Sequence, residues 1–302
     1  MGPPRGLFVG LTTLDLIHRL DRLPGADEKV TAHTQELVAG GPAAIAALTF
    51  AALGGQATLV TGLGSHPLAD IARVDLVGHG VAVRDLADHA LEPAVSAVRV
   101  HEADGTRSVS SPDAAQAADL VAPTELAAWV DAADVVLLDG HHPVLAQAAS
   151  SAARAEFVPV VLDAGRWRPV FAQLMPQAQF VVASSAFALD GLPADPSSIV
   201  DLGPEAAACS AGPGPIRWAV PGESGTVAVR PVSGGDTNGA GDVLHGAVAF
   251  AVAAVGAGRA LARWPEVLRF AADVATVRVE HSGARAWLAD PRPREWGQAW
   301  TS

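Results

Sequence analysis

Five short apolar segments rich in β-branched residues constrain the fold of this chain most strongly. They span residues 6–17, 57–64, 133–140, 158–165 and 178–184. Each is nearly continuous in apolar residues and most end at Gly, Asp or Ser, as is typical of strands buried on both faces of a parallel sheet. Helical spacing lies between them, at residues 42–53, about 68–79, 143–155 and 197–209. The alternation predicts a doubly wound α/β fold, with a mainly parallel sheet flanked by helices.

Two regions, at about 16–40 and 94–111, interrupt this alternation with extended, polar-rich segments. They predict a small β insertion that covers one edge of the sheet as a lid. Residues 216–232 contain two further strands around a turn with glycine. The sequence shows no convincing linker, so we expect a single domain over residues 1–302.

Charge and hydropathy exclude several classes of protein. The net charge is −12 without a basic cluster, which argues against nucleic-acid binding. Charged residues, Gly or Pro interrupt every apolar run before the roughly 20 residues that a membrane-spanning helix needs. Cys209 is the single cysteine, and the first residues lack the pattern of a secretion signal. We therefore expect a cytoplasmic protein that binds neither membranes nor nucleic acids.

The stretch DTNGAGD, residues 236–242, precedes a helical apolar pattern that begins near Gly239. The first amide groups of a helix have no partners within it, and the helix dipole adds positive charge there. The small residues Gly239, Ala240 and Gly241 would let a ligand approach those amides closely. The stretch therefore predicts an anion site at a helix entrance.

A plain turn is the alternative, because Asn-Gly is common in hairpins and Asp242 in a first helical turn complements the dipole by itself. Against it, Asp242 lies inside the predicted anion site, where its charge opposes anion binding, and Asp236 precedes the site. This placement favours a base beside a phosphate. The stretch lacks the Gly-Lys-Ser/Thr ending of a Walker loop.

DTNGAGD also matches the DTxGAGD signature of the ribokinase, or PfkB, sugar kinases. Residues 9–48 resemble the family in the order of strand, substrate Asp, lid and Gly-Gly helix entrance. The resemblance covers nearly the whole chain. It implies a ribokinase-like fold and ATP-dependent phosphorylation of a small sugar at a primary hydroxyl, with ATP and Mg²⁺ as cofactors and K⁺ as a further candidate.

The resemblance also implies roles for individual residues. Asp242 would be the general base that accepts the proton of the attacking hydroxyl, since a sugar hydroxyl is a poor nucleophile at neutral pH. Its anion hole would consist of Asn238, Gly239, Ala240 and Gly241. The sugar would contact Asp15, Gly40 and Gly41, and the nucleotide side would involve Ser184, Gly222, Gly225 and Asp236. No residue is predicted to bind a metal directly.

Two departures from the family pattern bear on the substrate. Ile45 stands where most members have Asn, and the family's Asn-x-x-Glu motif is unrecognisable around Ser184. Both departures resemble the branch of ketohexokinase and sulfofructose kinase, as do GGPAA, GAGDVLHGA and SGARA. In that branch an Arg holds the sulfonate, but His141 occupies its place here and Ser110 that of a nearby Asn. We assign no sulfonated substrate.

Three further residues are predicted to contact the substrate, each with a simpler alternative. Lys29, the single lysine, would contact an oxyanion or a hydroxyl, or else be a solvated surface residue. His141 would face the substrate or make a structural hydrogen bond. Asp139 would be a substrate ligand or a turn residue.

Two other functions stay open from sequence: a nucleoside kinase of the same fold, and a catalytically silent sugar-binding protein. A homodimer through the exposed edge of the β lid is a candidate assembly.

Overall fold

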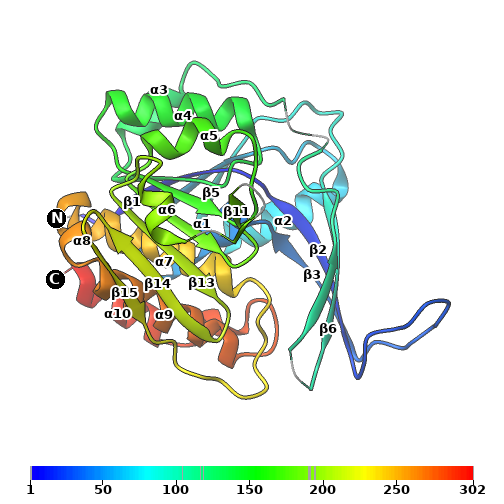
Figure 1. Cartoon of the computed structure of the whole chain (residues 1–302). Helices are drawn as coiled ribbons and strands as arrows, with labels where there is room; N and C mark the ends of the chain where they lie inside the picture. Colours follow the sequence, from blue (N-terminus) through cyan, green and yellow to red (C-terminus); the bar gives the residue numbers. More distant parts are fainter. Residues whose placement is uncertain are drawn as a thin grey trace.

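The computed structural model describes residues 2–301 except 104, 116, 118, 190, 191 and 194, with side chains undescribed at 192 and 193. Its centre is a nine-stranded sheet in the order β15-β14-β13-β10-β9-β8-β1-β4-β5 (Figure 1). The strands are β1 (Arg5–Val9), β4 (Gln56–Thr61), β5 (Val81–Asp85), β8 (Val135–Leu138), β9 (Val160–Ala164), β10 (Phe180–Ser184), β13 (Ala206–Ala211), β14 (Gly214–Val220) and β15 (Glu223–Val227). Neighbours from β5 to β13 are parallel, and β14 and β15 are antiparallel additions.

Helices cover both faces of this sheet, as Figure 1 shows with α3, α4 and α5 above it and α7, α9 and α10 below. The first group comprises α3 (Leu126–Asp131), α4 (Pro143–Ala155), α5 (Phe171–Leu174) and α6 (Pro196–Val200). The second comprises α1 (Pro42–Ala52), α2 (Pro67–Gly78), α7 (Ala240–Val255), α8 (Ala257–Ala262), α9 (Trp264–Glu280) and α10 (Arg292–Thr301). Two 3₁₀ turns, η1 (Met175–Gln177) and η2 (Ala286–Ala289), and the short pair β11 (Ala188–Leu189) and β12 (Leu192–Pro193) complete the elements outside the lid.

The central strands bury side chains on both faces, as their continuous apolar sequences predict. In β1, Leu7 and Val9 pack into the core with the first helix group, whereas Phe8 packs into the core with the second. All three are at most 1% exposed. The predicted doubly wound α/β class is therefore confirmed.

A separate four-stranded sheet, in the order β3-β2-β6-β7, forms the lid. It consists of β2 (Thr13–Leu20), β3 (Thr34–Gly40), β6 (Val95–His101) and β7 (Arg107–Ser110), with β2 antiparallel to β3 and parallel to β6. Its own small core joins Ile17, Val98 and Val100 to Ala284 near the C-terminal end. Strands β3 and β7 are its edges, and a dimer through them stays a prediction.

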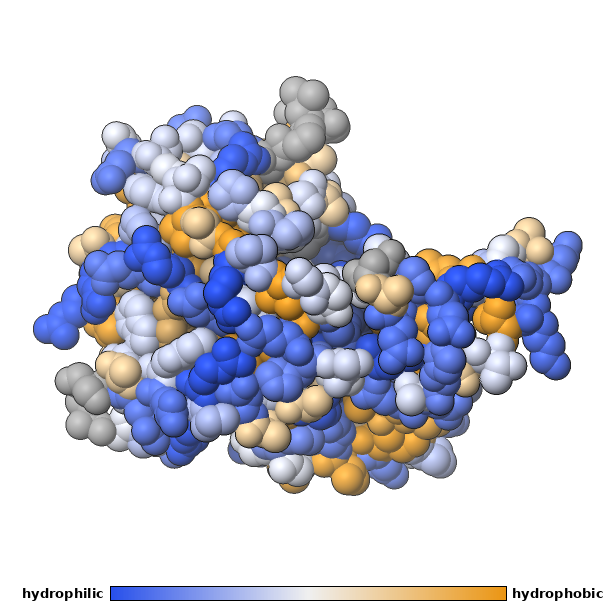
Figure 2. Space-filling view, turned by 90° about the horizontal axis from the view of Figure 1, so that it is seen from below, coloured by the Kyte–Doolittle hydropathy of each residue, from blue (hydrophilic) through white to orange (hydrophobic). Residues whose placement is uncertain are grey.

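The 21–33 loop between β2 and β3 extends away from the body (Figure 1). It forms part of a narrow, mostly hydrophilic projection at the right of Figure 2. Within the described part of the chain, no helix combines the length and the apolar character needed to cross a membrane.

Two predicted elements are wrong. The predicted helix at 197–209 ends early, because Gly203 adopts φ +123° after the short α6, and Ala206–Ala211 form strand β13 instead. Alanine favours helices by itself, but here the segment is buried between β10 and β14, so tertiary pairing overrides propensity. The predicted strand at 6–17 is two strands in different sheets, interrupted at Gly10–Thr12.

Candidate active site

The carboxyl edge of the central sheet collects the polar groups of the site. β1, β8, β9 and β10 all end there, and the N-termini of α1 and α7 point to the same place, where open α/β sheets bind ligands. The two helices are packed tightly, since a Cβ added to Gly246 of α7 would lie 2.4 Å from the carbonyl oxygen of Ala46 in α1. This close contact fixes the spacing of both N-termini.

Only one of these two helix entrances is open to a ligand. At α1, Pro42 has no N–H, and the amide of Ala43 donates to Asp139 Oδ2 at 3.2 Å. At α7, Gly239 adopts φ +75°, and a Cβ added to Gly241 would meet no described atom within 4 Å. Two amides of the predicted anion hole are used internally: that of Ala240 donates to the Thr237 carbonyl at 3.3 Å, and that of Asn238 to Asp236 Oδ1 at 3.0 Å. The amides of Gly239 and Gly241 are therefore the candidates for binding an anion at this entrance.

A pocket lies between the lid and these helix entrances. The lid contributes Asp15, Ile17, Val38 and Ala39, α1 and its entrance contribute Gly41, Ile45 and Leu48, and the α7 region contributes Asn238, Gly239, Asp242 and Val243. The structure thus brings together five residues that the sequence predicted for the site: Asp15, Gly41, Asn238, Gly239 and Asp242. The general assignment of a site to the DTNGAGD stretch has a geometric basis.

The C-terminal segment supplies the rest of the pocket lining, through Arg278, Ala284, Arg285 and Trp287. Sequence reasoning assigned no site role to these residues. The one sequence signal for this segment was the SGARA match at residues 282–286, which implied no role for any single residue. Arg285 is held in place by its ion pair with Asp75 at 2.6 Å and donates to the Ala39 carbonyl at 2.5 Å.

Asp15 lies on the pocket-facing side of β2. Thr13 Oγ1 donates to its carboxylate at 2.6 Å, and a Cβ on Gly40 would lie 2.2 Å from the Asp15 carboxyl carbon. Gly40 therefore makes room for this carboxylate. Burial raises the pKa of Asp15, while its hydrogen bonds from Thr13 and Ser96 act in the opposite direction.

Asp242 lies in the first turn of α7 and is half-buried. Burial, followed by the negative charge of Asp163, raises its pKa to about 7, although His245 and Arg107 oppose the shift. A carboxylate with a pKa near neutrality is suited to accept a proton from a hydroxyl.

Asp236, predicted to lie on the nucleotide side, is committed to internal contacts. It is 5% exposed, and its Oδ2 accepts from Arg19 at 2.6 Å and from Arg278 at 3.1 Å. Its Oδ1 accepts from the Asn238 amide at 3.0 Å. This geometry corrects the sequence interpretation: Asp236 joins lid strand β2 to α9 and shapes the anion-binding loop, with no carboxylate oxygen left over for a nucleotide.

The tip of the lid also touches this loop. Arg107 of β7 donates to Thr237 Oγ1 at 2.8 Å. A Cβ on Gly105 would lie only 1.9 Å from the Gly235 carbonyl oxygen. The lid is therefore closed onto the loop that precedes α7 in this conformation.

Asp139 and His141 form a buried cluster next to the pocket. Asp139 Oδ2 accepts from the amide of Leu11 at 2.8 Å, besides that of Ala43, and Oδ1 accepts from the amide of His141 at 3.0 Å. The His141 side chain pairs with Asp139 at 3.1 Å and contacts Arg168. Of the alternatives above, the geometry favours structural roles for both, because their polar atoms are used within the protein.

Burial by itself would lower the pKa of His141, but the charge of Asp139 and the hydrogen bond with Asp113 raise it to about 9. The same imidazolium holds the pKa of Asp139 well below its usual range. The pair is therefore ionised at neutral pH and ties β8 to the β1 and α1 ends.

Gly222 and Gly225, predicted to border the adenine, lie in the wrong place for that role. β13 runs to the carboxyl edge, but β14 runs back, so the turn at Gly222 is at the amino edge, opposite Asp242. Gly225 lies within β15 and leaves room for the Trp218 ring, 2.8 Å from an added Cβ. The turn that does lie at the carboxyl edge is 211–214, with Gly212 at φ +56°. Ser184, at the end of β10, is also at this edge and donates to the Gly165 carbonyl at 2.5 Å.

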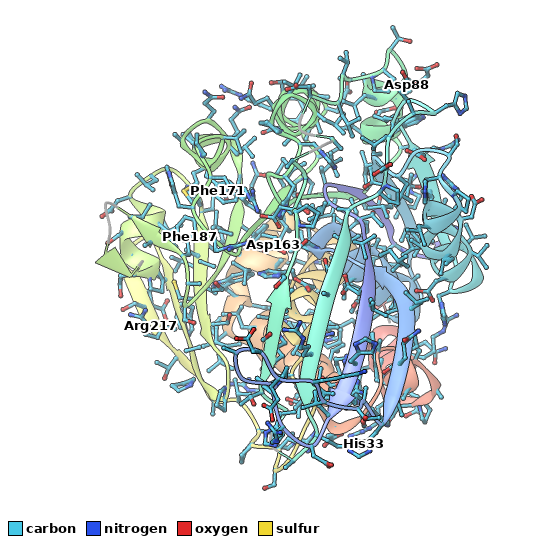
Figure 3. The ribbon with its side chains drawn as sticks, turned by 90° about the vertical axis from the view of Figure 1, so that its right-hand side faces the viewer. His33, Asp88, Asp163, Phe171, Phe187 and Arg217 are labelled. Carbon is cyan, nitrogen blue, oxygen red and sulfur yellow. The ribbon has the colours of Figure 1, made fainter. Side chains whose placement is uncertain are left out.

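Lys29 and Ser110 are exposed, Lys29 on the 21–33 loop and Ser110 at the end of β7. In Figure 3, His33 of the same loop lies at the lower edge of the molecule, whereas Asp163 lies near its middle. The structure therefore does not bring Lys29 to the pocket lining.

Asp163 and His245 are two further site residues that sequence reasoning missed. Asp163 is the penultimate residue of β9, and His245 follows Asp242 by about one turn of α7. Ligand-type atoms of Asp163, Asp242 and His245 all lie within 4.8 Å of one another. The i, i+3 spacing of Asp242 and His245 and the Asp that ends a buried strand were signals available in the sequence.

A larger hollow on the described surface, of about 620 Å³, is not this site. It lies beside Arg154, Phe157 and Gln179, at the amino edge of the sheet. It holds none of the acidic groups described above, so we place the chemistry at the smaller pocket around Asp242.

Comparisons with known proteins bear on the family and the fold. The model of the pfkB family of carbohydrate kinases matches residues 7–290. A protein of Agrobacterium tumefaciens solved as a candidate ribokinase has a TM-score of 0.82 and 25% identity, over 99% of both chains. The ribokinase of Arabidopsis thaliana, solved with ribose and ATP, has a TM-score of 0.77 and 23% identity over 100% of this chain and 99% of that one. A fructokinase of Xylella fastidiosa with bound ATP has a TM-score of 0.77 and 21% identity over 98% and 99%.

Proposed function

The chain belongs to the pfkB family of carbohydrate kinases, and we propose that it transfers the terminal phosphoryl group of ATP to a primary hydroxyl of a small sugar, with Asp242 as the general base. The observation that supports this most strongly is the place of Asp242. It combines a raised pKa, an exposed side on the pocket and a position in the open first turn of α7.

On the sugar side, Asp15 and Gly41 border the pocket with Asn238 and Asp242. The Asp15 carboxylate is a hydrogen-bond acceptor for sugar hydroxyls. Gly41, at φ +93°, packs against the Leu11 backbone, where an added Cβ would lie 2.4 Å from the carbonyl oxygen, and borders the pocket. Ile45 adds an apolar contact where a polar one would bind a further hydroxyl. The pocket therefore suits a substrate that presents hydroxyls to Asp15 and an apolar face to Ile45.

On the phosphate side, the amides of Gly239 and Gly241 stabilise negative charge at the helix entrance, where one such donor contributes about 10²-fold or more in rate. When bound with Mg²⁺, ATP supplies the phosphoryl group. We assign no protein ligand to the metal ion, which would be held through the phosphates. The 211–214 turn, with Gly212, replaces Gly222 as the candidate border of the nucleotide because it lies at the same sheet edge.

The direct test is ADP release over a panel of small sugars, with adenosine, cytidine and inosine as the nucleoside alternative. We expect turnover with at least one sugar. Because only ionised Asp242 can accept a proton, kcat/KM should rise with pH and level off above about 7. Turnover restricted to nucleosides would show that the substrate is a nucleoside and not a sugar. A kcat/KM that does not change between about pH 5 and 8 would refute Asp242 as the titrating base.

A monovalent cation is the remaining candidate cofactor, and the structure already holds a cation at the anion-binding loop. The Arg278 guanidinium donates to the Asp236 carboxylate at 3.1 Å, to the Asp236 carbonyl at 3.5 Å and to the His281 carbonyl at 3.0 Å. It is 2% exposed, so these oxygens are neutralised from within the chain.

We therefore expect equal kcat in K⁺, Na⁺ and tetramethylammonium salts at one ionic strength, measured by ADP release. Activation by K⁺ of several-fold over the other two would contradict this expectation. The equal ionic strength controls for general screening of the charged substrates.

A further inference from the structure

His245 is a buried titratable residue directly beneath Asp242, and the mechanism above does not use it. It is 3% exposed. Its Nε2 lies 3.1 Å from the Val182 carbonyl oxygen in β10, and its Nδ1 lies 3.0 Å from Asp163 Oδ2. Both ring nitrogens are therefore engaged by groups of the central sheet.

These two contacts fix the protonation of the ring. A carbonyl oxygen only accepts, so Nε2 must carry a hydrogen. Nδ1 lies 3.0 Å from Asp163 Oδ2, within ion-pair distance but without hydrogen-bond geometry, and the charge of this carboxylate favours the imidazolium form of the ring. Ligand-type atoms of His245, Asp163 and Asp242 all lie within 4.8 Å of one another. Because Nε2 is hydrogen-bonded and Nδ1 is at ion-pair distance from Asp163, we treat the cluster as an ion pair rather than a metal site.

We propose that the His245–Asp163 pair is an electrostatic positioning element beside Asp242 that sets the pH range of phosphoryl transfer. This inference rests on the proposed function of Asp242 as the base. Two carboxylates this close are costly to ionise together in a buried place, and a neighbouring imidazolium offsets part of their repulsion.

Of the other charged groups near Asp242, Arg278 and Arg285 of the C-terminal segment line the same pocket, and two more come from the lid. Arg107 of β7 lowers its pKa and Asp15 of β2 raises it, whereas Asp163 raises it more strongly than either. The first turn of α1, which packs beside α7, has no acidic side chain. Asp163 and His245 lie on β9 and α7 in the body, so they would act on Asp242 whether the lid is open or closed. Lid contacts cannot replace them in an open state.

The pair makes distinct predictions for its two members. In Asp163→Asn the repelling charge is gone, so the Asp242 pKa and the acid limb of kcat/KM should fall by about 1 pH unit or more. The Asp242 pKa should fall even if His245 loses its proton in this variant, because Asp163 shifts the pKa of Asp242 more than His245 does. If Asp163 only supported packing, its replacement would change the unfolding temperature and leave the acid limb of kcat/KM unchanged.

In His245→Asn the amide can still donate to Asp163, but the positive charge is lost. The two carboxylates then titrate as a coupled pair, and one of them should take up a proton about 1 pH unit or more above the highest wild-type value. NMR of protein labelled at its aspartate carboxyl carbons measures this directly, with Asp242→Asn and Asp163→Asn to assign the two signals.

His33→Asn is the matched control. His33 pairs with Asp21 at 2.8 Å on the 21–33 loop, outside the pocket lining, so its loss should change neither the limb nor the two NMR titrations. The proposal is overturned if folded Asp163→Asn keeps or raises the wild-type limb, or if folded His245→Asn leaves both carboxyl titrations unchanged. The NMR titrations need no substrate. A failure of the proposed sugar kinase activity would therefore appear as absent turnover with the coupling of the three groups still measurable.

Discussion

Replacing Asp242 with Asn should lower kcat by about 10²–10⁴-fold, with the fold and nucleotide binding retained. Asn has nearly the same shape and cannot accept the proton of the attacking hydroxyl. The side chain is half-buried at the pocket, so the change leaves the core intact. Steady-state ADP release measures the loss, and thermal shift with ATP measures binding.

Asp70→Asn is the control for the simpler alternative that Asp242 only complements a helix dipole. Asp70 lies in the first turn of α2, is exposed and is not part of the pocket lining. Its replacement should leave kcat within about twofold, since a dipole contact at the surface contributes only a few tenths of a kcal/mol to about 1 kcal/mol. Full activity of Asp242→Asn would refute its role as base.

Replacing Asp139 with Asn should destabilise the protein by about 3–5 kcal/mol, the cost of leaving one member of a buried ion pair without its partner. Three backbone amides and the His141 imidazolium all point at this carboxylate. An Asn side chain would turn an NH₂ donor toward some of those donors. Urea unfolding monitored by tryptophan fluorescence measures the change.

Asp134→Asn is the matched control, because Asp134 pairs with Arg5 at 2.9 Å with both side chains at least 35% exposed. Surface pairs of this kind contribute about 0–1 kcal/mol. If Asp139 were instead a substrate ligand, its replacement would raise KM for the sugar and leave the unfolding free energy near that of the wild type. That outcome would reverse the structural role given to it here.

The parts of the site that the sequence predicted are those encoded locally. In residues 236–242, glycine spacing, an acid and the start of an apolar helix lie next to one another, so the open entrance of α7 could be expected before any tertiary contact was known. Asp15 and Gly41 could be placed by the resemblance because each lies beside a strand or helix end with a recognisable pattern. Their convergence at one pocket follows from the parallel sheet.

The errors have a different origin: strand direction and long-range pairing are not written in a local segment. Gly222 has the composition of a ligand-binding turn, but the antiparallel course of β14 carries it to the opposite sheet edge. In the sequence Asp236 looks like an acid without partners. In the structure its carboxylate accepts hydrogen bonds from Arg19 and Arg278, which are 217 and 42 residues away along the chain. The partnership of His245 with Asp163 likewise depends on α7 packing over β9.

The central claim is that Asp242 removes a proton from a primary hydroxyl of a sugar during transfer from ATP. Phosphorus NMR of the product tests it most directly, by comparing the wild type with Asp242→Asn on the sugar that gives turnover in the panel. We expect a new phosphomonoester resonance, split by two methylene protons and equal in amount to the ADP formed, which is absent or reduced by orders of magnitude in the variant. A resonance split by a single methine proton, ADP without sugar phosphate, or equal product from both proteins would contradict the account.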